Sequence, residues 1–208
     1  MNITSYCRIA DNTIAHQGKV IFRADQKLDD FLLSAYDVLK PEYPKFYKMD
    51  RLSKLGFLAA EVLLRGRAIA NEYPSENISL VLSNAHASLD TDLRYAQSMQ
   101  TLPSPALFVY TLPNIVAGEI CIRHRLKGEN TFFVSEKFDA ELMETHVSAV
   151  TLVPCIAGWV DVMDEHHDVF LYLAENKPGA PAHTARQLRE LYQQDYGTIN
   201  GQPEKADY

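Results

Sequence analysis

The chain has 208 residues, of which 47% are hydrophobic and 23% charged, and it carries a formal net charge of −7. This length supports one domain with a sizeable core, and the acidic balance argues against a nucleic-acid partner, because phosphate contacts require a basic face. No apolar run is long enough to predict a membrane span, and residues 1–8 lack the basic start and apolar stretch of a signal peptide, so we expect a cytoplasmic protein.

The first half of the chain alternates apolar runs with polar breaks. Leu52, Leu55 and Ala59 recur at helical spacing after Asp50, which is a favourable N-cap residue. The nearly continuous apolar run over residues 77–83 is typical of a strand covered on both faces. In chain order we predict two strands or a loose hairpin over residues 5–22, a rigid proline loop over 41–44, a helix over 50–67, a strand over 77–83, a helix that starts at Asp90 and ends before Pro103, and an extended stretch over 105–110.

The second half continues this alternation. We predict a helix over residues 112–126 with Gly128 as its C-cap, a strand over 131–134, a mostly helical segment over 139–157, a strand over 169–173, a surface helix over 183–194 and a frayed end over 201–208. This order of elements predicts an α/β fold with a mainly parallel central sheet and helices on its faces. A change to polar composition separates a main domain over residues 1–176 from a polar C-terminal extension over 177–208.

Two segments of the chain carry motifs at a characteristic spacing. Residues 48–60 contain Met-Asp-Arg at a helix start, and residues 104–108 read Ser-Pro-Ala-Leu-Phe before an asparagine-led helix with an Ala-Gly pair. In order and spacing these motifs resemble those of the β-ketoacyl synthases, as do two further segments. Residues 128–131 read Gly-Glu-Asn-Thr, which resembles the family's Gly-Pro-Asn turn, and residues 158–161 read Gly-Trp-Val-Asp, which resembles its Gly-x-x-Asp turn. The resemblance covers residues 49–175 and implies the N-terminal half of a thiolase-like fold, similar to short, synthase-like proteins.

The nucleophile of this family has no counterpart in the chain. A ketoacyl synthase uses a cysteine thiolate at a helix N-terminus, where the dipole lowers the thiol pKa. Counted from Gly128, that position falls at about Lys137, and no cysteine lies within ten residues of it. An amine nucleophile must be desolvated, whereas Glu136 and Asp139 favour the charged form of this lysine. Ser135 has no adjacent base in the sequence, so we assign no catalytic residue to this degenerate position.

The other chemistry-bearing residues carry weaker signals. Cys7, Cys121 and Cys155 form no CxxC pair, and we interpret them as reduced, packed thiols, with Cys155 near a helix end. His166 and His167 are adjacent, whereas metal ligands on a helix stand three or four residues apart, so a polar turn is the better interpretation. Residues 83–88 follow a strand, where α/β proteins often place function, although a turn and helix cap is favoured. We expect no metal and no cofactor.

The resemblance implies a non-catalytic partner of a full-length ketoacyl synthase, similar to a chain-length factor of fatty-acid or polyketide (polyene) biosynthesis. In that family the strand before the nucleophile pairs with its equivalent across a two-fold axis, and residues after the Ser-Pro segment help to line the partner's acyl pocket. The implied interface and pocket residues are Phe108, Tyr110, Thr111, Leu112, Asn114, Thr131, Phe132, Phe133 and Val134.

The densest basic cluster contains Arg123, Arg125 and Lys127. It could dock an acyl carrier protein, although basic residues also suit the last turn of any helix.

Two other functions stay open. One is a condensing or acyl-transfer enzyme with an atypical nucleophile, and the other is a structural module that forms a homodimer without an acyl ligand. In each case the face on which the family's second half packs needs a cover, either from the segment after Lys177 or from a partner. We therefore expect the chain not to exist as a bare monomer.

Overall fold

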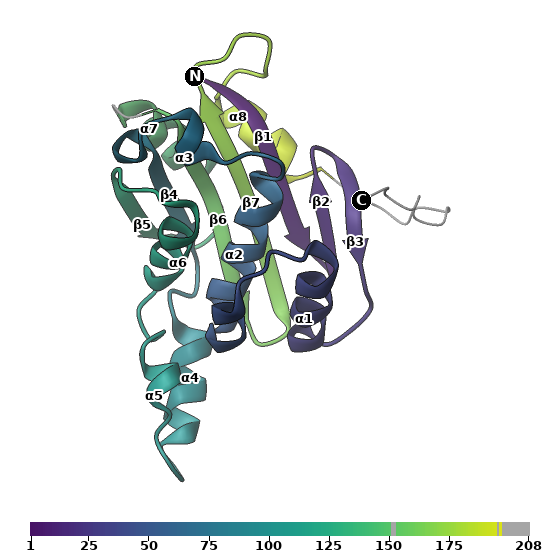
Figure 1. The fold of residues 1–208 in the computed structure, drawn as a ribbon, viewed down its shortest axis with the longest axis vertical. Helices are drawn as coiled ribbons and strands as arrows, with labels where there is room; N and C mark the ends of the chain where they lie inside the picture. The colour runs from purple at the N-terminus through teal and green to yellow at the C-terminus, as the bar shows by residue number, and fades with distance from the viewer. Residues whose placement is uncertain (151–152, 195, 197–208) are drawn as a thin grey trace.

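The computed structural model describes residues 1–150, 153–194 and 196. Its centre is a seven-stranded sheet in the order β3-β2-β1-β7-β6-β4-β5 (Figure 1). The strands are β1 (Asn2–Ala10), β2 (Thr13–His16), β3 (Lys19–Arg23), β4 (Ser79–Asn84), β5 (Asn130–Val134), β6 (Cys155–Met163) and β7 (His166–Glu175). The helices are α1 (Leu28–Leu39), α2 (Arg51–Leu63), α3 (Ile69–Glu72), α4 (Leu89–Ser98), α5 (Pro105–Phe108), α6 (Ile115–His124), α7 (Ala140–Ala149) and α8 (Ala185–Tyr192), with 3₁₀ turns η1 (Pro44–Lys48) and η2 (Ser75–Asn77).

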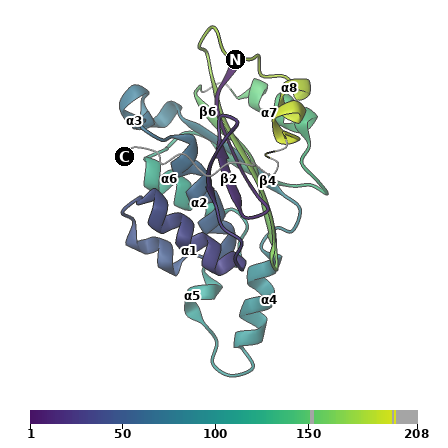
Figure 2. The same ribbon diagram turned by 90° about the vertical axis from the view of Figure 1, so that its right-hand side faces the viewer.

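Helices cover both faces of the sheet, which Figure 2 shows nearly edge-on. Helices α1, α2 and α6 lie on one face, and α7 and α8 lie on the other. Side chains alternate between these two cores along the central strands: Ile156 and Val160 of β6 pack on the α2 side, and Ala157 and Trp159 pack on the α7 side. Burial on both faces accounts for the continuous apolar runs in the sequence.

The α/β class with helices on both faces is confirmed, but the prediction of a mainly parallel sheet is wrong. Only β4 pairs in parallel, with β5 and β6. The pairs β6–β7, β7–β1, β1–β2 and β2–β3 are antiparallel. Short turns join β1 to β2, β2 to β3 and β6 to β7, and a short turn can connect only antiparallel neighbours.

The stretch over residues 105–110 is not extended as predicted, because it begins with the short helix α5. The Ser104 hydroxyl accepts a hydrogen bond from the Leu107 N–H at 3.3 Å, and Pro105 occupies the first helical position. Serine at the N-cap followed by proline is a helix-start signal that the sequence did contain.

The helix predicted over residues 139–157 ends at Ala149, and residues 155–157 belong to β6. Residues 158–161 form no turn and lie in the middle of the same strand. Residues 151–152 and the predicted frayed end at 201–208 lie outside the described residues.

Gly128 does not cap α6, since Arg125 takes the left-handed conformation that ends this helix (φ 59°). Gly128 instead passes so close to the neighbouring chain that a Cβ would lie 2.5 Å from the Ile78 carbonyl oxygen. Close backbone approach therefore explains this glycine.

The Met-Asp-Arg segment anchors the start of α2. The Asp50 carboxylate accepts hydrogen bonds from the Ser53 N–H at 2.9 Å and from the Thr91 hydroxyl at 2.6 Å. Arg51 binds both carboxylate oxygens of Asp29, at 2.8 and 2.7 Å, and the Asp164 carbonyl at 2.7 Å. These bonds tie α2 to α1, to α4 and to the β6–β7 turn, so in this chain the segment has a structural role.

The segment after Lys177 returns to the sheet. Leu188 of α8 is fully buried in the core on the α7 side. The Arg8 guanidinium lies 4.5 Å from the centre of the Tyr192 ring, and the Tyr192 hydroxyl donates a hydrogen bond to Asp168 at 2.5 Å. Helix α8 thus covers part of the sheet face on which α7 packs.

Gly158 permits a conformation in β6 that other residues cannot adopt. Its φ is +148°, and an added Cβ would lie 1.9 Å from the Phe170 carbonyl oxygen. We expect Gly158→Ala to destabilise the fold by more than about 4 kcal/mol, or to abolish folding, because backbone in the sheet centre would have to move. Urea denaturation followed by circular dichroism measures this change.

Gly118→Ala is the matched control. No atom lies within 4 Å of a Cβ added there, on the exposed side of α6, so we expect a change of at most about 1 kcal/mol, in the stabilising direction. Equal denaturation midpoints for the two variants would contradict the proposed clash.

Candidate functional site

The loop between β5 and α7 holds Ser135 and Lys137, near which the resemblance implied a degenerate nucleophile position. The Ser135 N–H donates to the Asn84 carbonyl at 2.9 Å, and the Ser135 hydroxyl donates to the Lys137 carbonyl at 3.0 Å. The Lys137 side chain is exposed. Asp139 caps α7 by accepting a hydrogen bond from the Leu142 N–H at 2.9 Å. A carboxylate therefore occupies the helix end that would stabilise a thiolate, and neither Ser135 nor Lys137 is set up as a nucleophile.

A histidine–aspartate pair joins the loop after β4 to the neighbouring strand β6. Buried Asp161 accepts hydrogen bonds at 3.0 Å from the N–H groups of Ala85 and His86, and its second oxygen lies 2.8 Å from His86 Nδ1. An imidazole oriented by a carboxylate can act as a general base. Within the described residues, no hydroxyl or thiol group hydrogen-bonds to this ring, so the pair's demonstrated role is to fasten the loop after β4 to the sheet.

The predicted turn over residues 83–88 is present, because the Asn84 side chain bonds the N–H and carbonyl of Ala87 at 3.0 and 2.8 Å. The partnership between His86 and Asp161 could not be predicted, since these residues are far apart in the chain. A charged residue inside an otherwise apolar strand is the one local feature that marks Asp161.

The three cysteines lie apart from this loop. Burial raises the pKa of the Cys155 thiol to about 12 and that of Cys121 to about 11, and it also raises the pKa of Cys7. Cys155 lies in strand β6 rather than near a helix end as predicted. Thiols held in the protonated form are poor nucleophiles, in agreement with the interpretation as packed residues.

Strand β5 forms one edge of the sheet, and among the described residues it pairs with β4 alone. In a parallel strand, each residue directs its N–H and C=O groups to the same side, and successive residues use opposite sides. Since Ser135 bonds to β4, the backbone groups of Phe132 and Val134 face the open edge. Val134 also exposes 59% of its surface. Such an edge is a ready template for a strand from another chain.

The predicted interface residues of this strand divide between its two faces. Phe132 packs against the core on the α2 side, and Phe133 packs against the core on the α7 side, where its ring centre lies 4.7 Å from that of His146. Thr131 is half-buried, like both phenylalanines. The side chains of β5 thus pack partly within this chain, whereas the backbone groups along its outer edge have no partner among the described residues.

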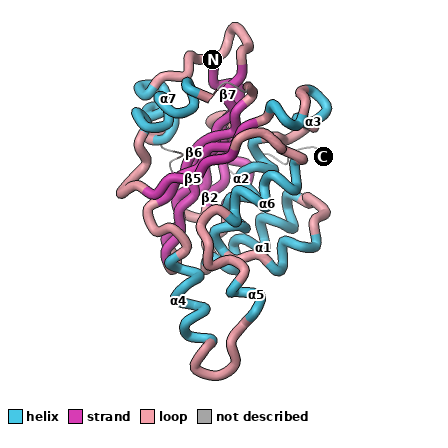
Figure 3. The backbone as a smooth tube through the Cα atoms, turned by 90° about the vertical axis from the view of Figure 1, so that its left-hand side faces the viewer, coloured by secondary structure: helices cyan, strands magenta, loops and turns pink. Residues whose placement is uncertain are grey.

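Helices α4 and α5 and the loops beside them project from the body as an arm over residues 89–112 (Figure 1). Seven of the eleven large exposed hydrophobic side chains in the described residues lie on this arm: Leu89, Leu93, Met99, Leu102, Phe108, Val109 and Leu112. Apolar surface gathered in this way marks an interaction site. Figure 3 presents the β5 edge of the molecule, with α6 beside β5 and the arm below both.

The predicted pocket residues on and beside the arm differ in their exposure to solvent. Phe108 is 59% exposed and its ring centre lies 5.4 Å from that of Tyr95 on α4. Tyr110 is buried, and its hydroxyl donates to Glu119 at 3.2 Å. Thr111 is half-buried, and its hydroxyl donates to the Phe108 carbonyl at 2.8 Å. Asn114 is exposed at the N-cap of α6, without a side-chain capping bond. Phe108 and Leu112 therefore face solvent, whereas Tyr110 supports the fold.

The predicted basic cluster is largely neutralised. Arg123 forms hydrogen bonds to both carboxylate oxygens of Glu61, at 2.6 and 3.1 Å. Lys127 lies 3.6 Å from Glu76 in an exposed pair. The Arg125 side chain makes no ion pair or hydrogen bond with another described residue. Only one of the three cations is thus available for a partner.

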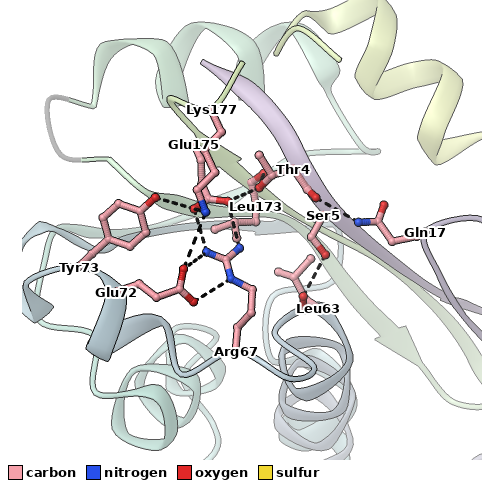
Figure 4. A network of polar contacts seen from close by, with 10 residues as sticks. All are labelled: Thr4, Ser5, Gln17, Leu63, Arg67, Glu72, Tyr73, Leu173, Glu175 and Lys177. Carbon is pink, nitrogen blue, oxygen red and sulfur yellow. Dashed lines mark hydrogen bonds and ion pairs between the residues drawn. The ribbon is translucent and has the colours of Figure 1, made fainter. Parts of the chain in front are cut away.

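The densest polar network surrounds Glu175 at the end of β7 (Figure 4). This fully buried carboxylate binds Arg67 at 2.9 and 3.0 Å, the Tyr73 hydroxyl at 2.7 Å, Lys177 at 3.0 Å and the Thr4 hydroxyl. Burial alone raises the pKa of Glu175, but hydrogen bonds from Arg67, Thr4, Tyr73 and Lys177 outweigh it and lower the pKa to about 2. Every oxygen of this carboxylate is occupied, so the network is structural.

Two further kinds of feature are absent from the described residues. These residues contain no group of three or more His, Cys, Asp or Glu side chains placed to hold a metal ion. None of the helices in this part of the chain combines the length and apolar character needed to cross a membrane.

Comparison of the sequence with protein-family models gives no match, and comparison with curated proteins gives none either. Solved structures do match. One is a ketosynthase (ApeO) in complex with its chain length factor (ApeC) from Xenorhabdus doucetiae, with a TM-score of 0.54, 11% sequence identity, and coverage of 92% of this chain and 90% of that chain.

A second similar structure is AntDE:AntF, a type II polyketide synthase acyl-carrier protein in complex with its ketosynthase bound to the hexaketide. The TM-score is 0.55 at 10% identity, and the match covers 84% of this chain and 62% of that chain. At these identities the likeness establishes the fold alone. The chain therefore shares its α/β fold with a chain of each of these ketosynthase complexes.

The buried Glu175 network predicts an acid-sensitive fold. The pKa of Glu175 falls from 4.5 to about 2 on folding, so its contribution is complete above pH 4.5 and is lost as the pH falls toward 2. We expect about 3 kcal/mol of unfolding free energy to disappear across this window, and Glu175→Gln to remove that part of the pH dependence. At neutral pH the variant should be about 3 kcal/mol less stable, because Arg67 loses its buried counter-charge.

Urea denaturation at a series of pH values checks both effects. Glu190→Gln serves as the control, since Glu190 lies half-exposed in a pair with Arg186 on α8. A Glu175→Gln variant with the same acid profile as the wild type would show that this carboxylate does not control acid stability.

Proposed function

We propose that this protein is a non-catalytic, chain-length-factor-like partner of a full-length ketosynthase in polyketide or fatty-acid biosynthesis. The observation that carries the proposal is the open edge of β5 beside the exposed apolar arm over residues 89–112, on a ketosynthase fold. The partner's own edge strand would pair with β5, and the arm would lie over the partner's acyl pocket.

The edge and the arm fit one large partner better than two small ones. The edge offers main-chain hydrogen bonds, which fix the register of a docked strand. The arm offers apolar side chains on the same side of the molecule, and these supply the buried area that a stable interface needs. A ketosynthase subunit would present both a strand and an apolar pocket.

The β5–α7 loop supports a role without chemistry of its own. An exposed lysine stands at the expected nucleophile position, and Asp139 occupies the helix end behind it. A subunit of this kind contributes wall and contact surface, and the active partner supplies the thiolate and the oxyanion hole. Docking of an acyl carrier protein would then fall mainly to the partner, because Arg123 and Lys127 already pair with carboxylates.

Val134→Pro tests the strand pairing. Proline removes the N–H that faces the open edge and leaves the bonds from β5 to β4 in place. With ketosynthases encoded in the same genome as partners, we expect the wild-type chain to form a heterodimer, and the variant to bind at least about tenfold more weakly, as measured by sedimentation or isothermal titration.

Val134→Thr is the control for this change, because it keeps both the β-branched shape and the N–H. A proline variant that binds as tightly as the threonine variant would refute pairing through β5. A wild-type chain that forms only homodimers would favour the structural-module alternative.

Phe108→Ala tests the pocket wall. Removal of this exposed ring should lengthen the acyl chain that the heterodimer produces, because the pocket gains volume, whereas Phe108→Trp should shorten it. Product chains are compared by mass spectrometry after a condensation assay. Leu33→Ala removes an apolar side chain on α1 that is 37% exposed, and it should leave product length unchanged. Tyr110 is unsuitable for this test, since its buried bond to Glu119 couples it to folding.

The isolated chain is assayed in parallel. Condensation without a ketosynthase would overturn the non-catalytic proposal and favour an enzyme with an atypical nucleophile.

A further inference from the structure

A pocket of about 710 Å³ opens on the helical face of the molecule, where the C-terminal ends of α1, α2 and α6 meet. Its volume lies in the range of small-molecule sites. The basic side chains that line it are Lys40, Arg65, Arg67, Arg123, His124 and Arg125.

This concentration of positive charge contrasts with the rest of the chain. The net charge is −7, yet four of the ten arginines of the sequence line this one pocket. Only Glu42 and Glu61 contribute carboxylates to its walls. An ordinary solvated surface of an acidic protein would not sort its arginines in this way.

Part of the charge has a structural purpose. Arg67 is held by Glu72 and Glu175, and Arg123 is held by Glu61. Each of the three helix ends also carries a partial negative charge of about half an electron, which neighbouring cations offset. These contacts explain the positions of Arg67 and Arg123, but they do not explain every cation of the pocket.

Arg65 and Arg125 are the cations without a structural partner. Both side chains are exposed, and neither forms a side-chain hydrogen bond or ion pair with another described residue. Arg65 follows the end of α2, and Arg125 ends α6, so two different elements bring them to the same pocket. Gly66, which follows Arg65 and also lines the pocket, leaves space beside it, because a Cβ added there (φ +75°) would meet no atom within 4 Å.

We propose that this pocket binds a small phosphate-bearing molecule, with the guanidinium groups of Arg65 and Arg125 contacting the phosphate oxygens. Arginine presents planar pairs of N–H donors that match phosphate geometry. A multiply charged group is favoured over a single carboxylate, because the ligand must outweigh the repulsion from Glu42 and from the three helix ends. The remaining pocket volume would hold the organic part of the ligand.

This site lies apart from the β5 edge and the arm, and the inference does not rest on the proposed partnership. It is tested on the isolated chain by binding alone, so its failure and the failure of heterodimer formation are distinguishable.

Isothermal titration of the full chain with inorganic pyrophosphate at low ionic strength tests the proposal. We expect saturable binding of one pyrophosphate per chain. Arg65→Ala and Arg125→Ala should each weaken it about tenfold, the loss expected for one charge-assisted contact. Both residues are exposed and unpaired, so the variants should keep the wild-type urea midpoint, which confirms that folding is intact.

Arg186→Ala, which changes an exposed arginine of α8, is the matched control and should bind as the wild type does. Arg65→Lys and Arg125→Lys keep the charge but lose the paired donors, and should bind more weakly than the wild type. Absence of saturable pyrophosphate binding would overturn the proposal. An equal loss in Arg186→Ala would overturn it too, because the attraction would then be due to overall charge.

Discussion

The buried carboxylate of Glu175 is the constraint on which much of this structure depends. It lies at the end of β7, in the centre of the sheet, and an unpaired charge there would be prohibitively costly. Arg67 neutralises it, and to reach it the chain after α2 must turn back across the end of the sheet. The same turn presents Arg65 and forms one wall of the pocket. The need to neutralise Glu175 in the core thereby also shapes the pocket at the surface.

The strands at the two edges of the sheet are connected in different ways. On one side β1, β2 and β3 follow each other through short turns and form an antiparallel meander. On the other side β4 and β5 run parallel, so the segments that connect them must cross over, and they contain the arm and α6. Open backbone and exposed apolar side chains consequently gather at the same end of the molecule. A partner that covered this end would satisfy both at once, which is the physical basis for the proposed role.

Features with a local cause could be predicted from the sequence, whereas those set by distant residues could not. The cap at Asp50 and the buried strand over residues 79–84 depend on a few neighbouring positions, and both are present. The direction of strand pairing depends on which segments meet, and the apolar pattern of β6 is compatible with either direction. Gly158 illustrates the limit: its role depends on the carbonyl of Phe170 in the next strand, whereas the family motif that residues 158–161 resemble implied a turn. The bond between His86 and Asp161 had no local signal for the same reason.

The β5–α7 loop differs by more than one residue from the nucleophile loop that the family resemblance implies. In a ketosynthase the helix end behind the cysteine must remain free, so that its dipole can stabilise a thiolate. Here Asp139 occupies that end, and Glu136 and Asp139 place negative charge on both sides of Lys137. These carboxylates would oppose a thiolate as strongly as they accommodate an ammonium group. The negative charge of the loop therefore suits a binding surface better than a catalytic site. This agrees with the proposal of a subunit that acts through its edge strand and its arm.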